Sequence, residues 1–187
     1  MDVTLVKRCQ AGDESAAAQI FENYKNLVYQ TAFLILDSRD DAEDVLQEVF
    51  IQAYRSLGKY DQAKGALSTW LHRITVNRCL NWRRRWKFFG VSLDETSENA
   101  LQAPVISADQ RAEIEALRQS VRKLSLKLRT VLILRYYWDL SYAELSEILD
   151  LPLGTVKSRL NQALHILQMN LKDEYAPCTL PSSEVSK

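Results

Sequence analysis

Cysteine, glycine and proline are scarce in this chain. Its 187 residues include three cysteines, five glycines and four prolines. Cys9, Cys79 and Cys178 are widely spaced and form no CxxC motif, which argues against a disulfide framework and against a zinc site. Reduced thiols in a cytosolic protein are the expectation. With so few turn-forming residues and few alternating β-branched runs, the sequence predicts an all-α fold.

Long apolar runs are missing as well. No stretch reaches the ~18 apolar residues of a transmembrane helix, so no membrane insertion is expected. The amino-terminal stretch turns polar too soon for a signal peptide. These two absences predict a cytoplasmic location. Apolar residues make up 47% of the chain and charged residues 26%, which is a globular composition with room for one domain or two small ones.

The chain also lacks a net charge, because its 24 basic and 24 acidic side chains cancel. A self-sufficient DNA-binding protein is usually basic. The charges are nevertheless segregated along the chain. Residues 37–48 carry six acids and one base, residues 73–87 carry six bases and no acid, and residues 92–110 carry four acids and no base. Such a chain presents different surfaces to different partners.

Residues 140–171 contain two amphipathic helical patterns separated by a short break at 150–154. The first begins with Ser141 and has Glu144 three residues later, which is the signature of a capping box. Pro152 cannot continue the first helix but suits the start of the second. The second pattern has one apolar stripe, formed by Val156, Leu160, Ala163, Leu164, Leu167 and Leu171. The arrangement is typical of a helix-turn-helix.

The opposite face of the second pattern carries amide, hydroxyl, imidazole and cationic groups. These side chains hydrogen-bond base edges and phosphates in DNA complexes. They are Ser158, Asn161, Gln162 and His165, flanked by Lys157 and Arg159. The alternative is an ordinary helical hairpin with a solvated face, but such a face usually mixes both charge signs and this one is poor in acids. We therefore predict a DNA-reading surface.

Residues 40–57 predict a helix with an acidic exposed face. Its buried side is Ala42, Val45, Leu46, Val49, Phe50 and Ala53, and its opposite side is Asp40, Asp44, Gln47, Glu48, Ile51 and Arg55. Acid spacing of this kind raises the possibility of a metal site, but a di-iron bundle needs two Glu-x-x-His motifs. His72 and His165 do not supply them, so no metal ion is expected. An apolar Ile51 among acids favours a protein contact over a solvated face.

Residues 70–86 predict a helix in which indoles and bases alternate without one apolar stripe. Ser68 and Thr69 are expected to cap it, after a loop at 58–65. Cations neutralise phosphates, and aromatic faces stack on unpaired bases. We therefore predict a nucleic-acid contact here. The alternative, with indoles in the core and solvated arginines, remains open for one or two of the tryptophans.

Helical spacing also recurs over residues 13–36, as one or two helices, and over 111–123. Residues 127–138 are apolar nearly all round, which predicts a helix buried under the helix-turn-helix. Residues 91–110 lack periodicity and are predicted to be a linker. Residues 173–187 are polar and contain proline, which predicts a disordered tail.

Three strings occur in order along the chain: DAEDVLQEVFIQAY at 41–54, LSTWLHRITVNRCLNWRRR at 67–85 and LSYAELSEILDLPLGTVKSRL at 140–160. With them, residues 10–172 resemble the extracytoplasmic-function (ECF) sigma factors of bacteria, group IV of the sigma-70 family. The resemblance implies two small helical domains joined by a flexible linker, region 2 at 1–90 and region 4 at 111–172. It also implies a protein without enzymatic activity or cofactor that binds core RNA polymerase and directs promoter-specific initiation in response to stress or a signal.

The resemblance also implies roles for individual residues. The acidic helix docks on the clamp coiled-coil of the polymerase through Asp40, Asp44, Gln47, Glu48 and Ile51. The minus-ten element is contacted and opened by Lys64, Ser68, Thr69, Trp70, Arg73, Asn77 and Arg78, and the basic run Arg83, Arg84 and Arg85 extends that surface. The minus-thirty-five element is read by Thr155, Lys157, Ser158, Arg159, Asn161, Gln162 and His165. Region 4 also packs on the polymerase flap, and an anti-sigma factor is the expected inhibitor.

Two features depart from the family pattern. Gln162, His165 and Gln168 stand where the family often has further arginines, which predicts fewer phosphate contacts and a shallower salt dependence. Leu124-Ser125-Leu126 replaces the usual Leu-Pro before the helix at 127. The alternative function is a self-sufficient dimeric helix-turn-helix regulator, which leaves the acidic helix and the WRRRW run unexplained.

Overall fold

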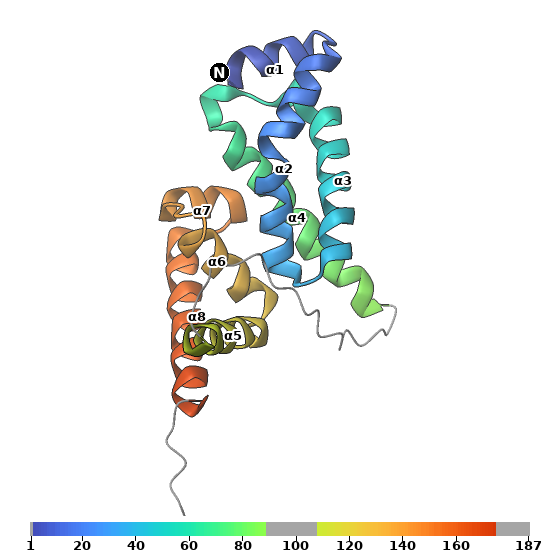
Figure 1. Cartoon of the computed structure of the whole chain (residues 1–187). Coiled ribbons are helices and arrows are strands. Elements are labelled where there is room, and N and C mark those ends of the chain that lie inside the picture. The colour runs from blue at the N-terminus through green and yellow to red at the C-terminus, as the bar shows by residue number, and fades with distance from the viewer. Residues whose placement is uncertain (1, 89–107, 175–187) are drawn as a thin grey trace, which may run out of the picture.

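The computed structural model describes residues 2–88 and 108–174, and every regular element within these ranges is a helix. The all-α prediction is confirmed. The N-terminal bundle consists of α1 (Asp2–Gln10), α2 (Glu14–Leu36), α3 (Arg39–Ser56) and α4 (Leu67–Phe88), with two short 3-10 turns, η1 (Leu57–Lys59) and η2 (Gln62–Lys64). The C-terminal bundle consists of α5 (Ala108–Lys123), α6 (Leu126–Tyr136), α7 (Tyr142–Leu149) and α8 (Leu153–Glu174) (Figure 1).

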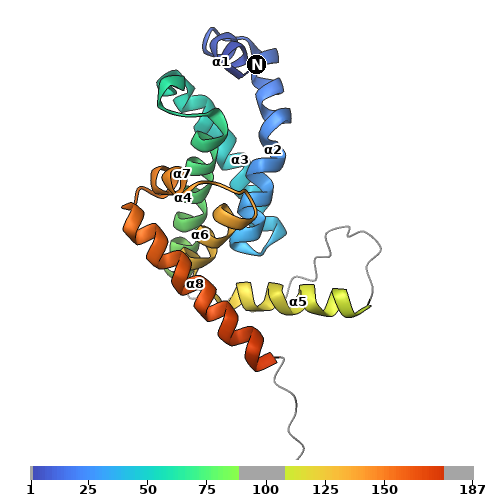
Figure 2. The same ribbon diagram turned by 90° about the vertical axis from the view of Figure 1, so that its left-hand side faces the viewer.

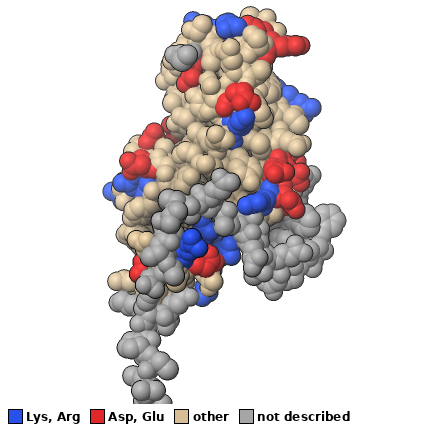
Figure 3. All heavy atoms as spheres, in the orientation of Figure 1, with Lys and Arg blue, Asp and Glu red and all other residues tan. Residues whose placement is uncertain are grey.

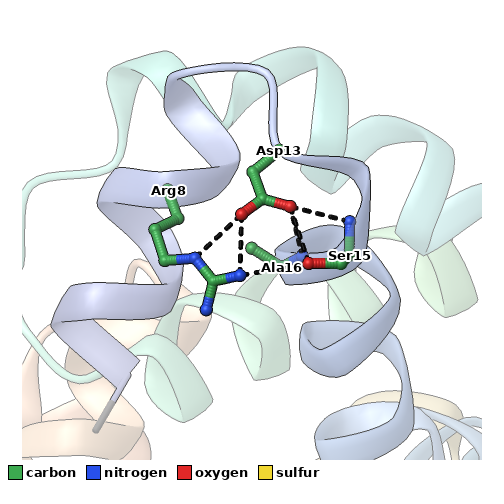
Figure 4. Close-up of polar contacts among 4 residues, drawn as sticks. All are labelled: Arg8, Asp13, Ser15 and Ala16. Carbon is green, nitrogen blue, oxygen red and sulfur yellow. Dashed lines mark hydrogen bonds and ion pairs between the residues drawn. The ribbon is translucent and has the colours of Figure 1, made fainter.

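Helix α2 is the centre of the N-terminal bundle and packs against α1, α3 and α4. Asp13 caps it by accepting hydrogen bonds from the backbone N–H groups of Ser15 and Ala16. Arg8 of α1 pairs with the same carboxylate at 2.7 Å (Figure 4). The hydrogen bonds from Ser15, Arg8 and Ala16 lower the pKa of Asp13 to about 2. One ionised carboxylate therefore fixes the corner between α1, which the sequence patterns did not predict, and α2.

Helix α4 begins earlier than predicted. Its first residue is Leu67, and the N–H of Trp70 already donates to the carbonyl of Ala66 at 3.1 Å. Ser68 and Thr69 therefore lie inside the first turn, and the prediction that they cap the helix is wrong. The physical reason is burial, because Leu67 is only 2% exposed and its packing extends the helix backwards.

The missing apolar stripe of α4 also has a structural cause. This helix packs against α2 and α3 within its own bundle and against α6 and α7 of the C-terminal bundle. Buried side chains therefore occupy most of its circumference, namely Leu67, Thr69, Leu71, His72, Ile74, Thr75, Val76 and Cys79. A helix contacted on two sides leaves no single apolar face to detect in the sequence.

The C-terminal bundle confirms most of the predicted helix-turn-helix. Residues 128–134 of α6 are all buried, including the polar Arg129 and Thr130. The predicted buried helix at 127–138 is wrong at its ends, because Lys127, Tyr136 and Tyr137 are exposed and α6 ends at Tyr136. Ser141 and Glu144 form the predicted capping box of α7. Asp150, with a left-handed φ of 52°, ends that helix, and the carbonyl of Pro152 accepts the first N–H bonds of α8. The predicted apolar stripe is wrong at Leu164, which is 39% exposed because it lies outside the contact with α5, α6 and α7.

Two predicted segment boundaries fall close to helix ends. Helix α5 begins at Ala108, so the last three residues of the predicted linker, 108–110, are helical. Helix α8 continues to Glu174, two residues into the predicted tail. Packing of α5 against α8 extends these helices beyond what local periodicity indicated. The rest of the predicted linker and tail lies outside the described residues.

The two bundles contact each other. Helix α6 packs on α2, and α7 packs on α4, so that α7 lies beside the middle of the N-terminal bundle (Figure 1). Seen from the side, α8 runs diagonally along the edge of the C-terminal bundle, and α5 extends sideways from beside the middle of α8 (Figure 2). No helix in the described ranges combines the length and apolar character needed to cross a bilayer.

Candidate nucleic-acid interfaces

A cavity of about 190 Å³ lies at the start of α4. The rings of Tyr60 and Trp70 meet there at 5.3 Å between centroids. Tyr60 donates to the carbonyl of Gly65 at 3.0 Å, which holds the loop around η2 against the ring. The lining residues are Lys59, Tyr60, Asp61, Gly65, Ala66, Thr69, Trp70 and Arg73, together with Glu147 and Ile148 of α7. The cavity thus combines aromatic surface with a cationic side chain.

Three residues predicted to contact the minus-ten element line this cavity, namely Thr69, Trp70 and Arg73. Thr69 is buried, whereas Arg73 is exposed. Asn77 is exposed one turn further along the face of Arg73, and Ser68 is half-buried in the first turn. The side chains of Lys64, Arg83, Arg84 and Arg85 lie outside the described part of the structure.

Tyr60, Lys59 and Asp61 were not predicted as site residues. Lys59 ends η1, and Tyr60 and Asp61 lie between η1 and η2, in a segment whose polar composition indicated only a loop. The aromatic residue Tyr60 in that loop could have indicated the site from the sequence, because an aromatic side chain between turns needs a packing partner. Its partner, Trp70, is ten residues away and comes into contact only through the fold.

Two tryptophans of α4 pack on the hydrophobic core. The indole N–H of Trp82 donates to Asp41 on α3 at 3.0 Å, and its ring is half-buried against the core. Trp70 is also half-buried against the core, although one side of it faces the cavity. The alternative in which the indoles belong to the core therefore holds for Trp82. Trp70 contributes both to core packing and to the cavity.

The exposed face of α3 remains acidic and partly apolar. Asp40, Asp44 and Gln47 are exposed, and Ile51 is 51% exposed although it is apolar. Acidic side chains gather on the side of the molecule where α3 lies (Figure 3). Glu48 differs from the others because it is half-buried and pairs with Arg78 of α4 at 3.0 Å.

The predicted reading face of α8 is present as one surface. Lys157, Ser158, Asn161, Gln162 and His165 are exposed, and Thr155 and Arg159 are half-buried. Ser158 donates to the carbonyl of Thr155 at 3.0 Å, and the ammonium of Lys157 lies 5.7 Å from the ring centre of Tyr142. The backbone therefore brings all seven predicted side chains to the first 13 residues of one 22-residue helix.

His72 is the buried titratable group between the two bundles. Its Nδ1 lies 3.3 Å from Thr31 Oγ1, and its ring packs edge to face on Trp138 of the C-terminal bundle. Burial lowers the pKa of His72 to about 4, against the opposing effect of the Glu144 carboxylate. His72 is therefore neutral at physiological pH. Among the described residues, no group of three His, Cys, Asp or Glu side chains is placed to hold a metal ion.

Two family models match the chain, Sigma-70 region 2 over residues 20–88 and Sigma-70, region 4 over residues 114–167. The chain is 32% identical to the ECF RNA polymerase sigma factor SigW of Bacillus subtilis, covering 90% of this chain and 95% of that protein. It is 32% identical to the RNA polymerase sigma-H factor of Pseudomonas aeruginosa, covering 91% and 94%. It is 33% identical to the ECF RNA polymerase sigma-E factor of Haemophilus influenzae, covering 91% and 95%.

Solved structures share the fold at lower identity. CnrH in complex with the cytosolic domain of CnrY is 21% identical, with a TM-score of 0.68 and coverage of 92% of this chain and 98% of that chain. The sigma factor RpoE in complex with the anti-sigma factor NepR from Bartonella quintana is 22% identical, with a TM-score of 0.69 and coverage of 83% and 96%. These similarities extend over both bundles.

Proposed function

The chain belongs to the extracytoplasmic-function sigma factors of the sigma-70 family, and from this premise we propose how its residues divide promoter recognition. Proteins of this family are non-enzymatic initiation factors that bind core RNA polymerase and promoter DNA. The N-terminal bundle corresponds to region 2 and the C-terminal bundle to region 4. The alternative of a self-sufficient dimeric regulator has no support, because both domain models and the nearly full-length relatives are sigma factors.

The cavity at Tyr60 and Trp70 receives an unstacked base of the minus-ten element. Unstacking a base costs a few kcal/mol, and stacking on an aromatic side chain returns roughly 1–3 kcal/mol per base. Arg73 at the cavity and Asn77 one turn along supply a cation and an amide for the neighbouring strand. The observation that carries this proposal is the tilted pair of aromatic rings beside an exposed arginine.

Helix α8 reads the minus-thirty-five element in the major groove, whose width of about 12 Å admits a helix. Asn161 and Gln162 are suited to pair with adenine edges, and Arg159 or Lys157 with guanine or phosphate. The face contains few cations, so affinity depends on the polymerase holding both bundles in place. This matches the zero net charge of the chain.

The exposed face of α3 docks on the polymerase clamp. Asp40, Asp44 and Gln47 supply charge and hydrogen-bonding groups, and Ile51 supplies apolar contact area. Glu48 instead positions Arg78 between the docking helix and the DNA-contacting helix. Region 4 also packs on the polymerase flap. The protein acts in the cytoplasm with the polymerase, and an anti-sigma factor holds it inactive. The similar sigma factor RpoE of Bartonella quintana is bound to the anti-sigma factor NepR in its solved structure.

Trp70 provides the test of the minus-ten assignment. A promoter selected from a library with the reconstituted holoenzyme serves as template, and permanganate reactivity of unpaired thymines measures opening. Trp70→Ala is expected to reduce opening at least about tenfold, the loss of ~1.4 kcal/mol or more, without weakening binding to the core enzyme. Asn81→Ala, an exposed substitution on the same helix, is the control. Equal opening by Trp70→Ala and wild type would refute the assignment.

A further inference from the structure

A second cavity, of about 340 Å³, lies where the carboxyl end of α2 meets α5 and α6. Small-molecule sites in proteins have volumes of about 300–1,000 Å³, whereas gaps larger than a water molecule are few in protein interiors. None of the described residues assigned above to polymerase or promoter binding lines this cavity. The proposed function therefore leaves it unexplained.

The walls of this cavity are mostly apolar. Leu132 and Ile133 of α6 are buried, whereas Leu117 of α5 is 46% exposed and Tyr136 and Tyr137 are 60% and 50% exposed. The exposed side chains lie where the cavity meets solvent. A ligand with an apolar body covers them when it enters, and removing apolar surface from water is favourable.

The polar part of the lining is predominantly cationic. In the described ranges its charged residues are Arg118, Arg122, Arg129 and a single acid, Asp37. Arg122 pairs with Asp37, the residue that ends α2, at 2.6 Å. Arg129 is 5% exposed and donates to the carbonyl of Ile35 at 3.0 Å and to the carbonyl of Arg122. These bonds fix two guanidinium groups beside the apolar walls.

This combination selects one class of ligand. A guanidinium group presents a planar fork that matches a carboxylate or a phosphate. A phosphate monoester carries about −1.5 to −2 charges at pH 7, and removing more charge from water costs more free energy. A carboxylate carries one charge and is therefore the better anion for a half-enclosed cavity. The apolar walls require a long apolar chain attached to it.

We propose that this cavity binds a long-chain carboxylate, with the carboxylate at Arg122 and Arg129 and the chain against α5 and α6. The ligand contacts α2 of the N-terminal bundle and two helices of the C-terminal bundle. Because it binds the folded protein, it also stabilises it. The sigma factor thereby responds directly to the concentration of such amphiphiles. This inference does not depend on the function proposed for the cavity at Tyr60 and Trp70.

Isothermal titration calorimetry of the full-length protein tests the ligand class. The probes share one chain length and differ in the head group: decanoate, decanol, decyltrimethylammonium and decyl phosphate, all below their micelle concentrations. Decanoate is expected to bind at one site, about fourfold more tightly for each CH₂ added from octanoate. Decanol and decyltrimethylammonium are expected to bind at least about tenfold more weakly, the loss of one charge-assisted contact.

A bulky substitution tests the location. Leu117→Trp places a larger side chain where the cavity meets solvent, and it is expected to weaken decanoate binding at least about tenfold, because the chain loses its place. Ile114→Trp is the matched control. Ile114 is 43% exposed on the same helix but does not line the cavity, so wild-type affinity is expected. Circular dichroism verifies the helix content of both variants.

A gain of affinity provides a second test, because a misfolded variant cannot produce it. Asp37→Asn removes the negative charge from the lining but keeps the size of the side chain, and asparagine tolerates the left-handed φ of 59°. It is expected to tighten decanoate binding about tenfold and to leave decanol binding unchanged. Asp139→Asn is the control, because Asp139 also has a left-handed φ, of 49°, and pairs with Arg135 outside the cavity.

Three results would overturn the proposal. The first is no decanoate binding by either the wild type or Asp37→Asn. The second is an equal affinity of decanoate and decanol, which would remove the role of the arginines, or tighter binding of decyl phosphate, which would remove the choice of a carboxylate. The third is an equal loss of affinity in Leu117→Trp and Ile114→Trp, which would place the ligand elsewhere.

Discussion

The guanidinium of Arg78 on α4 lies 3.0 Å from the carboxylate of Glu48 on α3. The Nε of Arg78 also donates to Gln52 on α3, at 2.8 Å. This pair connects the helix proposed to dock on the polymerase to the helix proposed to contact the minus-ten element. Each side chain is about one-third exposed, 36% for Arg78 and 33% for Glu48. The ion pair therefore contributes little to stability, and its main effect is to orient Arg78 on α4 relative to α3.

The acidic face of α3 yields the first prediction. Asp44→Arg is expected to weaken binding to core polymerase by at least about tenfold, because reversing a charge in a complementary contact costs several kcal/mol. Glu48→Gln is expected to have a smaller effect, since Glu48 is already engaged by Arg78. Binding is measured by fluorescence anisotropy with labelled sigma factor. Glu43→Arg, an exposed acid on the same helix, is the control. Equal affinities for Asp44→Arg and Glu43→Arg would contradict the docking face.

The reading face of α8 yields the second prediction. Asn161→Ala is expected to cost about 1–3 kcal/mol on the selected promoter and to relax specificity at one base pair of the minus-thirty-five element. Lys157→Ala is expected to weaken binding similarly on all sequences and to lower the salt slope by about one. Holoenzyme binding to a set of single-base promoter variants at several salt concentrations distinguishes the two effects. If Asn161→Ala weakened binding equally on all promoter variants, Asn161 would not contact a base.

His72 yields a prediction about pH. Its pKa is lowered to about 4 in the folded protein, first by burial and against the opposing Glu144, whereas an exposed histidine titrates near 6.5. The unfolded state therefore binds more protons below pH ~6.5, and stability falls as the pH drops from there towards about 4. At pH 5 the loss is about 2 kcal/mol.

Urea unfolding at pH 7 and pH 5 measures this loss. His72→Gln is expected to show a smaller fall between these pH values, because glutamine does not titrate. The variant His165→Gln, which changes an exposed histidine of α8, is the control and is expected to retain the fall. An NMR titration of the His72 ring with a midpoint near 6.5 in the native protein would contradict the burial argument.

Asp13 yields a prediction about the corner between α1 and α2. Asp13→Ala removes the cap of α2 and the partner of Arg8, and is expected to lower the Tm by about 4 °C. Asp13→Asn keeps an N-cap oxygen but loses the charge, so a smaller decrease is expected. Because the pKa of Asp13 is lowered to about 2, its charge contributes above pH ~4 and is lost as the pH falls through about 2. Calorimetry measures the Tm of the two variants and checks that Asp13→Ala lowers it more than Asp13→Asn does. Glu14→Gln is the control.

Local patterns determined much of this protein. The capping box at Ser141 and Glu144, the buried middle of α6 and the polar face of α8 follow from residues within one helix or one turn of each other. Periodicity detects such features because a helix with one partner buries one face. The exposed acidic face of α3 followed from the same reasoning. Three motif strings in order were sufficient to identify the family.

Contacts between distant residues were decided only by the tertiary structure. The start of α4 at Leu67 depends on burial, the Arg78–Glu48 pair joins residues 30 positions apart, and Tyr60 meets Trp70 through a loop that has no periodicity. Glu147 belongs to α7 of the C-terminal bundle and is more than 70 positions from Trp70. It lines the cavity only because α7 packs on α4. A sequence pattern records whether a side chain is buried, whereas the partner that buries it is chosen by the packing of the whole chain.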